Sequence, residues 1–156
     1  MTAATATAAG RTSSAPSSAG ARPVVLLGRI AFAAIFLAAA PRHFTPEGIH
    51  HAAELGVPLA GLLVPLSGLM SLAGGLSVLV GYRARWGAWL LVAFLVPVTC
   101  MLHAFWTLHD PVLIHTQQAM FMKNLSMLGA ALLLTQIGAG PLSFDAVRSR
   151  STIERE

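Results

Sequence analysis

Residues 59–80 (LAGLLVPLSGLMSLAGGLSVLV) and 86–106 (WGAWLLVAFLVPVTCMLHAFW) are two uncharged or nearly uncharged apolar stretches, joined by the short connection GYRAR at 81–85. Each is close to the ~20 residues with which a helix, rising about 1.5 Å per residue, crosses ~30 Å of hydrocarbon. Because lipid offers backbone groups no hydrogen-bond partner, such stretches cross a membrane as helices. The short connection makes the two helices antiparallel neighbours.

Two further apolar stretches, 24–40 and 118–137, flank this pair. The whole chain of 156 residues is 55% hydrophobic and only 10% charged, with a mean hydropathy of +0.69, which excludes an ordinary soluble domain. The sequence therefore predicts an all-α fold, an integral membrane four-helix bundle with its spans at 24–40, 59–80, 86–106 and 118–137. In the second span, small residues every four positions predict close helix packing, at Ser67, Ser71 and Gly75.

The bundle is predicted to occupy residues 23–145, between two polar ends. Residues 1–22 are rich in Ala, Ser and Thr and lack apolar periodicity, so we expect a disordered tail there, and residues 146–156 read as a polar C-terminal tail. Arg29 interrupts the first span and leaves an apolar core short enough for a secretory signal. We favour a retained helix, because a cut after the Ala38–Ala40 run would place Pro41 directly behind the cleavage site.

Basic residues set the expected orientation, because short loops rich in Lys and Arg stay in the cytoplasm. They gather before the first span, between the second and third, and after the fourth, at Arg11, Arg22, Arg83, Arg85, Arg148, Arg150 and Arg155. Both termini are therefore predicted to be cytoplasmic, with 41–58 and 107–117 outside. Within the first outer connection, Thr45-Pro46-Glu47 resembles a helix start and predicts a short surface helix over Pro46–Leu55.

All six histidines fall on the predicted outer side, at His43, His50, His51, His103, His109 and His115. Imidazole suits a metal, haem or quinone-headgroup site, but histidines are also tolerated as solvated groups in interfacial loops. No HxxxH or HExxH spacing is present, so no metal site is predicted. The single cysteine, Cys100, excludes an internal disulfide and a CxxC pair.

Two ionisable residues inside the spans, His103 and Lys123, fall at similar predicted depths below the outer boundary, where such groups are costly unless paired or facing a cavity. With Trp106 and Asn124 they form the candidate ligand site: a cation, an amide and an aromatic wall suited to an anionic or carbonyl-bearing ligand such as a quinone head. The alternative is that Lys123 reaches the headgroups and pairs with an acidic residue of the outer loops.

Near the inner boundary, Arg29 can reach the headgroups or form a structural ion pair with Asp145, which we favour. No triad, phosphate-binding glycine loop or carboxylate dyad is present, so catalytic residues stay unknown and a self-contained hydrolase or kinase is not expected. The basic residues are scattered rather than clustered, which argues against nucleic acid as a partner.

The chain resembles the DoxX family of small bacterial four-helix membrane proteins. The resemblance covers about residues 24–145 and is carried by short motifs in order, at Leu27-Gly28-Arg29, Gly56-Val57-Pro58, Gly74-Gly75-Leu76, Gly81-Tyr82-Arg83-Ala84-Arg85, His103-Ala104-Phe105-Trp106, Phe121-Met122-Lys123-Asn124-Leu125 and Gly140-Pro141-Leu142-Ser143.

The DoxX resemblance implies a multi-pass protein of the bacterial inner membrane, associated with a quinone-linked or oxidative-stress-related redox complex, with quinone as a possible cofactor and a soluble or membrane redox protein as partner. The alternative is a non-catalytic scaffold or assembly factor. A small-solute permease is a weaker third interpretation, because four short helices enclose little volume unless they form a homo-oligomer. Family likeness indicates fold more firmly than substrate.

Overall fold

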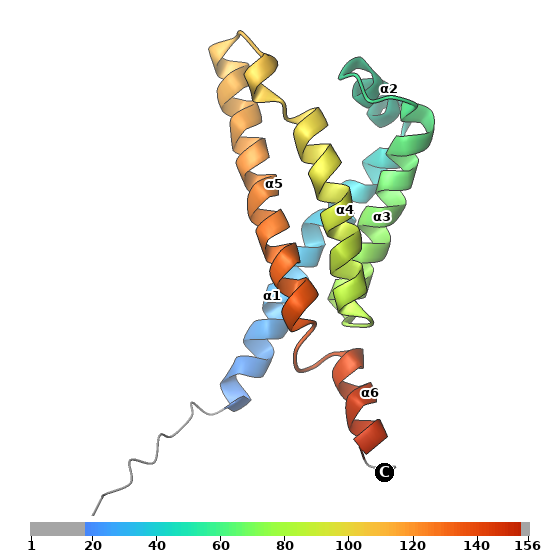
Figure 1. Cartoon of the computed structure of the whole chain (residues 1–156), viewed down its shortest axis with the longest axis vertical. Helices are drawn as coiled ribbons and strands as arrows, with labels where there is room; N and C mark the ends of the chain where they lie inside the picture. The colour runs from blue at the N-terminus through green and yellow to red at the C-terminus, as the bar shows by residue number, and fades with distance from the viewer. Residues whose placement is uncertain (1–17, 154–156) are drawn as a thin grey trace, which may run out of the picture.

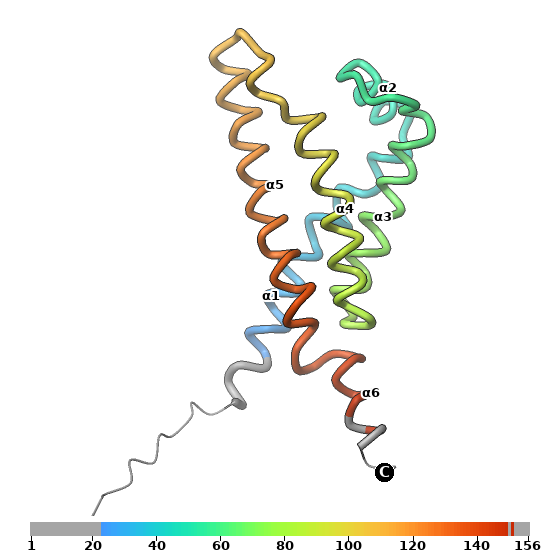
Figure 2. The backbone as a smooth tube through the Cα atoms, in the orientation of Figure 1, coloured from blue at the N-terminus to red at the C-terminus, as the bar shows by residue number. Residues whose placement is uncertain are grey.

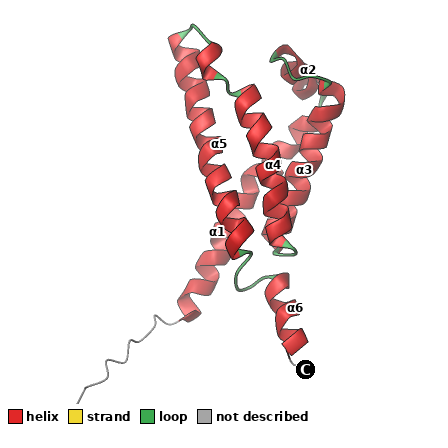
Figure 3. Ribbon diagram, viewed as in Figure 1, coloured by secondary structure: helices red, strands yellow, loops and turns green. Residues whose placement is uncertain are grey.

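A computed structural model describes residues 18–153, and the regular structure in that range is entirely helical (Figure 3). The elements in chain order are α1 (Ser18–Ala39), the 3-10 helix η1 (Ala40–Phe44), α2 (Pro46–Glu54), α3 (Ala60–Val80), α4 (Ala84–Leu102), the 3-10 helix η2 (Phe105–Thr107), α5 (Pro111–Ile137) and α6 (Phe144–Ile153).

Polar side chains fix the starts of two helices. The Thr45 hydroxyl accepts a hydrogen bond from Gly48 N, and Pro46 takes the first helical position of α2. The Asp110 carboxylate accepts from Val112 N and Leu113 N at the start of α5, where Pro111 has the same role. The short helix predicted over Pro46–Leu55 is therefore confirmed as α2, Pro46–Glu54.

The four long helices pack in the order α1, α3, α4, α5, so that α4 lies between α3 and α5 while α1 packs against α3. The chain path in Figure 2 runs up α1, down α3, up α4 and down α5. In Figure 1, α2, η2 and the start of α5 lie at one end of the bundle, which we call the α2 end. The opposite end, where α6 follows α5, is called the α6 end.

The core of the bundle depends on small residues of α3 that allow close helix packing. A Cβ on Gly74 would lie 2.7 Å from Leu91 Cγ and 2.9 Å from Gly87 O, so α3 and α4 approach closely there. On the adjoining face, Ser71 is fully buried and donates to Phe36 O of α1 at 3.1 Å. Above and below these contacts, large side chains fill the centre, among them Phe36, Val78, Leu91, Phe94 and Leu95.

The prediction of four spans is confirmed. Four helical segments are long and apolar enough to cross a membrane, at Pro23–Phe44, Ala60–Val80, Ala84–Thr107 and Pro111–Ile137. At most 33% of any span is buried within the chain, and many exposed side chains are large and apolar. That exposure would be costly in water but matches the hydrocarbon of a bilayer.

Several boundaries differ from those predicted. The fourth helix begins at Pro111 instead of residue 118, because Asp110-Pro111 is itself a helix start, which the polar run at residues 115–118 separates from the long apolar stretch. The third span is not continuous to residue 106: α4 ends at Leu102, and η2 follows after a break at His103 and Ala104. Residues 18–22, expected in the tail, belong to α1, and residues 1–17 of that tail lie outside the described residues. At the other end, α6 occupies most of the predicted C-terminal tail, of which residues 154–156 are likewise outside the described range.

Candidate functional site: a cavity at the α2 end

A cavity of about 580 Å³ lies at the α2 end, between the α1–η1 junction, α2, α3 and α4. We call it the α2 cavity. Most of its lining is apolar, with α3 contributing Val64 and Met70 and α4 contributing Phe94, Pro97 and Met101. Its size and apolar walls are those of sites that enclose small lipophilic molecules.

His103 is a polar residue in the lining of the α2 cavity. It follows directly after α4, and its Nδ1 lies 2.7 Å from Gln117 Oε1 of α5. Because an amide oxygen only accepts, Nδ1 carries the proton in this pairing. The Nε2 atom of the neutral ring then keeps a free lone pair and accepts hydrogen bonds, whereas Nε2 of the protonated ring donates.

His43 lines the cavity from η1 with the same pattern. Its Nδ1 lies 3.3 Å from Ala39 O, and its ring packs against Phe94 with centroids 5.7 Å apart. Gly68 makes this placement possible, since a Cβ there would lie 2.6 Å from the His43 Cβ. A carbonyl only accepts, so a neutral His43 also presents Nε2 as an acceptor.

Arg42 and His51 add a cation and a third imidazole to the lining. Within the described residues 18–153, no three His, Cys, Asp or Glu side chains come together in a way that could hold a metal ion. An apolar chamber with imidazoles, an amide and a guanidinium can bind a lipophilic molecule by a polar head.

Of the four residues of the predicted ligand site, His103 lines the α2 cavity and the other three lie outside its lining. Trp106 is in η2 and packs edge-on against Phe105 and Phe121, at centroid distances of 5.2 and 5.7 Å. Lys123 is exposed, with its Nζ 3.3 Å from Met120 Sδ. Asn124 is buried between the helices at 5% exposure.

The geometry of α5 explains why Lys123 and His103 do not share a pocket. Gln117 faces His103, and at about 100° per residue Lys123 lies about 120° around the helix from Gln117. Asn124 returns to within about 20° of the Gln117 direction and is buried accordingly. The predicted site compares only the depths of residues along two helices, and depth does not determine the direction in which each side chain points.

Gln117, His43, Arg42 and His51 are the lining residues that the predicted site omitted. The sequence carries a signal for Gln117, because it shares a helical face with Asn124. No sequence pattern indicates that His43 and His103, sixty residues apart, line one cavity. Their proximity depends on the packing of η1 and α4 against α3.

At the α6 end, the structure brings Arg29 and Asp145 into one cluster but joins each to backbone groups. The buried Arg29 guanidinium donates to Leu79 O, Ala139 O and Leu142 O at 3.0 to 3.2 Å. The Asp145 carboxylate accepts from Arg83 N and Ala84 N at 2.8 and 3.0 Å, and so caps α4 from a distant part of the chain. Arg29 and Asp145 each bind backbone groups in this arrangement and not one another, so the ion pair predicted between them stays a hypothesis.

The fold and the α2 cavity define a multi-pass α-helical membrane protein with a chamber at one end of its bundle. The model of the SURF4 family matches residues 64–150, more than half of the chain, and the protein belongs to that family. The match runs from α3 to α6 and so includes His103, Gln117 and the Asp145 cap. No curated protein and no solved structure matches the chain.

This family corrects the resemblance to DoxX proteins inferred from the sequence. The motifs behind that inference are short and rich in Gly, Ala, Leu and aromatic residues, which recur in unrelated membrane helices because small residues pack and aromatic residues sit at the interface. The redox and bacterial expectations rested on that resemblance and lose its support, and the quinone expectation keeps only the argument from the side chains of the candidate site. Any ligand has to be argued from the α2 cavity itself.

Proposed function

We propose that this protein binds a membrane-soluble molecule whose polar head lies among the imidazoles of the α2 cavity. The observation that carries the proposal is the His103–Gln117 hydrogen bond on the wall of a largely apolar chamber. The amide of Gln117 fixes the imidazole tautomer and orients the ring, as partners of functional histidines do. The Nε2 atom is thereby available to the occupant of the cavity.

The chemistry of the two histidines defines the head that fits. A neutral His103 or His43 accepts a hydrogen bond from a hydroxyl, and a protonated one donates to a carbonyl or anionic oxygen. A quinol and its quinone present these two kinds of group on a lipophilic body. Quinone binding is therefore the specific form of the proposal, and a role beside a redox partner would follow from it.

The test is photo-crosslinking of the detergent-purified protein with an azido-quinone that has a short isoprenoid tail, followed by peptide mapping and native mass spectrometry. We expect labels on α3 and α4 residues of the α2 cavity. His103→Leu should reduce labelling about tenfold, the factor for one lost hydrogen bond of about 1.4 kcal/mol. Gln117→Leu should reduce it by a smaller factor, because the His103 ring remains.

Lys123→Met is the matched control, since it removes an intramembrane polar group that lies outside the α2 cavity. Labelling within twofold of the wild type is expected. Loss of labelling in Lys123→Met with full labelling in His103→Leu would instead support the site predicted from sequence. Equal labelling in all variants would refute quinone recognition by the cavity.

A second function, a non-catalytic scaffold, is favoured by the exposure of α5, since only 17% of its apolar 18-residue window is buried within the chain. Such a face packs against lipid or against a helix of a partner or a second copy. Native mass spectrometry of the gently purified protein distinguishes these cases. A stable complex with no retained small molecule would favour the scaffold over the ligand-binding function.

A further inference from the structure

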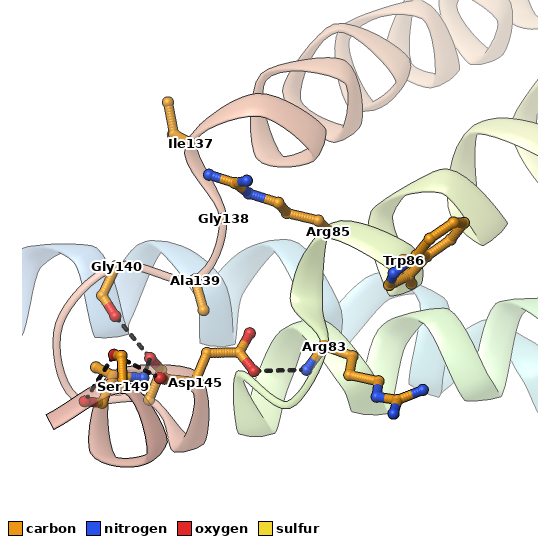
Figure 4. Close-up of a pocket in the computed structure, with 11 residues that line it drawn as sticks. Arg83, Arg85, Trp86, Ile137, Gly138, Ala139, Gly140, Asp145 and Ser149 are labelled. Carbon is orange, nitrogen blue, oxygen red and sulfur yellow. Dashed lines mark hydrogen bonds between the residues drawn. The ribbon is translucent and has the colours of Figure 1, made fainter. Parts of the chain in front are cut away.

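A second cavity, of about 390 Å³, lies at the α6 end, where the start of α4, the end of α5 and the start of α6 meet (Figure 4). It is independent of the α2 cavity and lies at the opposite end of the bundle. Its lining includes Arg83, Arg85, Trp86, Ile137 and Gly138. Basic, aromatic and aliphatic groups thus meet at the level where α4 begins and α5 ends.

Arg85 is the charged group that points into this region. Its side chain extends from the start of α4 toward Gly138 and Ile137 at the end of α5, whereas Arg83 points away (Figure 4). Gly138 has φ +72° and no side chain, and a Cβ there would lie 3.4 Å from Arg85 Nε. The guanidinium therefore lies over bare backbone.

The Arg85 charge is not neutralised within the described part of the chain. Within the described residues 18–153, Arg85 makes no ion pair and no hydrogen bond. The one acid in the cavity lining, Asp145, already accepts from Arg83 N and Ala84 N. A guanidinium with five donors is thus available for an anion.

An apolar route leads from this guanidinium into the membrane. Ile137 and Trp86 are 70% and 72% exposed, and they lie at the ends of spans, at the expected depth of the lipid headgroups. A molecule that places a phosphate on Arg85 would run its acyl chains along the exposed faces of α4 and α5. Guanidinium groups match phosphate oxygens in a bidentate geometry.

We infer that the cavity at the α6 end binds the phosphate of an anionic phospholipid, with Arg85 as its main ligand. The experiment is native mass spectrometry of the full chain in detergent, titrated with phosphatidylglycerol. Arg85→Gln should reduce phosphatidylglycerol retention at least fivefold, and Arg85→Lys should retain an intermediate amount, because a lysine keeps the charge but loses the bidentate geometry.

Arg148→Gln is the matched control, since it removes the same charge from α6 at the same end of the bundle but outside the cavity lining. A loss below twofold is expected. Equal losses in Arg85→Gln and Arg148→Gln, with unchanged thermal unfolding, would show attraction to overall charge and overturn the site. Full displacement of the lipid by millimolar inorganic phosphate would show a soluble-anion site and overturn the role of the acyl chains.

Discussion

Replacing Arg29 by Met should weaken the α6 end of the bundle, because its buried guanidinium binds three carbonyls from two separate segments. Two of these carbonyls, Ala139 O and Leu142 O, lie in the turn between α5 and α6, and the third, Leu79 O, is in the last turn of α3. Three hydrogen bonds at about 0.6–1 kcal/mol each amount to about 2–3 kcal/mol of unfolding free energy. The apolar stem of Met replaces part of the packing but none of these bonds.

The assay is unfolding in mixed micelles by SDS titration, followed by tryptophan fluorescence and far-UV circular dichroism. Lys123→Met serves as the control, because it also removes a cation from a span but breaks no bond to a carbonyl, and it should change the free energy by less than about 0.5 kcal/mol. A loss below about 0.5 kcal/mol for Arg29→Met would refute the assignment of a clamp to this residue.

A double-mutant cycle with Asp145→Asn tests the ion pair predicted from sequence. Asn keeps one side-chain oxygen and loses the charge, so the single change should cost about 1 kcal/mol through the weakened cap of α4. Because each residue is bound to backbone groups, we expect the two losses to add to within about 0.5 kcal/mol. A coupling energy above about 1 kcal/mol would instead support the direct ion pair.

Two further predictions concern packing and orientation. Gly74→Val should destabilise the bundle by about 1–3 kcal/mol in the same SDS titration, because a Cβ at position 74 meets Leu91 and backbone. Gly129→Ala should be neutral or slightly stabilising, because a Cβ at position 129 has no neighbouring atom within 4 Å. Equal effects of the two changes would refute the close contact of α3 with α4. In a Cys100→Ser background, a membrane-impermeant maleimide should label His109→Cys in intact cells and Ser151→Cys only after permeabilisation, and the opposite pattern would reverse the predicted orientation.

The sequence predicted the spans because the bilayer imposes a simple requirement. A segment must be apolar over about 20 residues to cross, and that property is local and additive along the chain. Local capping chemistry predicts the start of α2 at Thr45-Pro46, and the same signal stands at Asp110-Pro111, where a polar run at residues 115–118 separates it from the apolar stretch. The importance of the α3 small residues was also visible, although their partners were not.

Tertiary structure alone decided the sites. The meeting of His103 with Gln117, and of both with His43 across the α2 cavity, depends on the rotation of each helix about its axis and on which helices are neighbours. The depth of a residue along a span follows from its position in the sequence, which predicts similar depths for His103 and Lys123. The rotation of a helix about its axis depends on packing contacts between residues far apart in the chain. That rotation directs Lys123 away from the α2 cavity. For the same reason Asp145 caps α4 and Arg29 binds three carbonyls, contacts that no local pattern specifies.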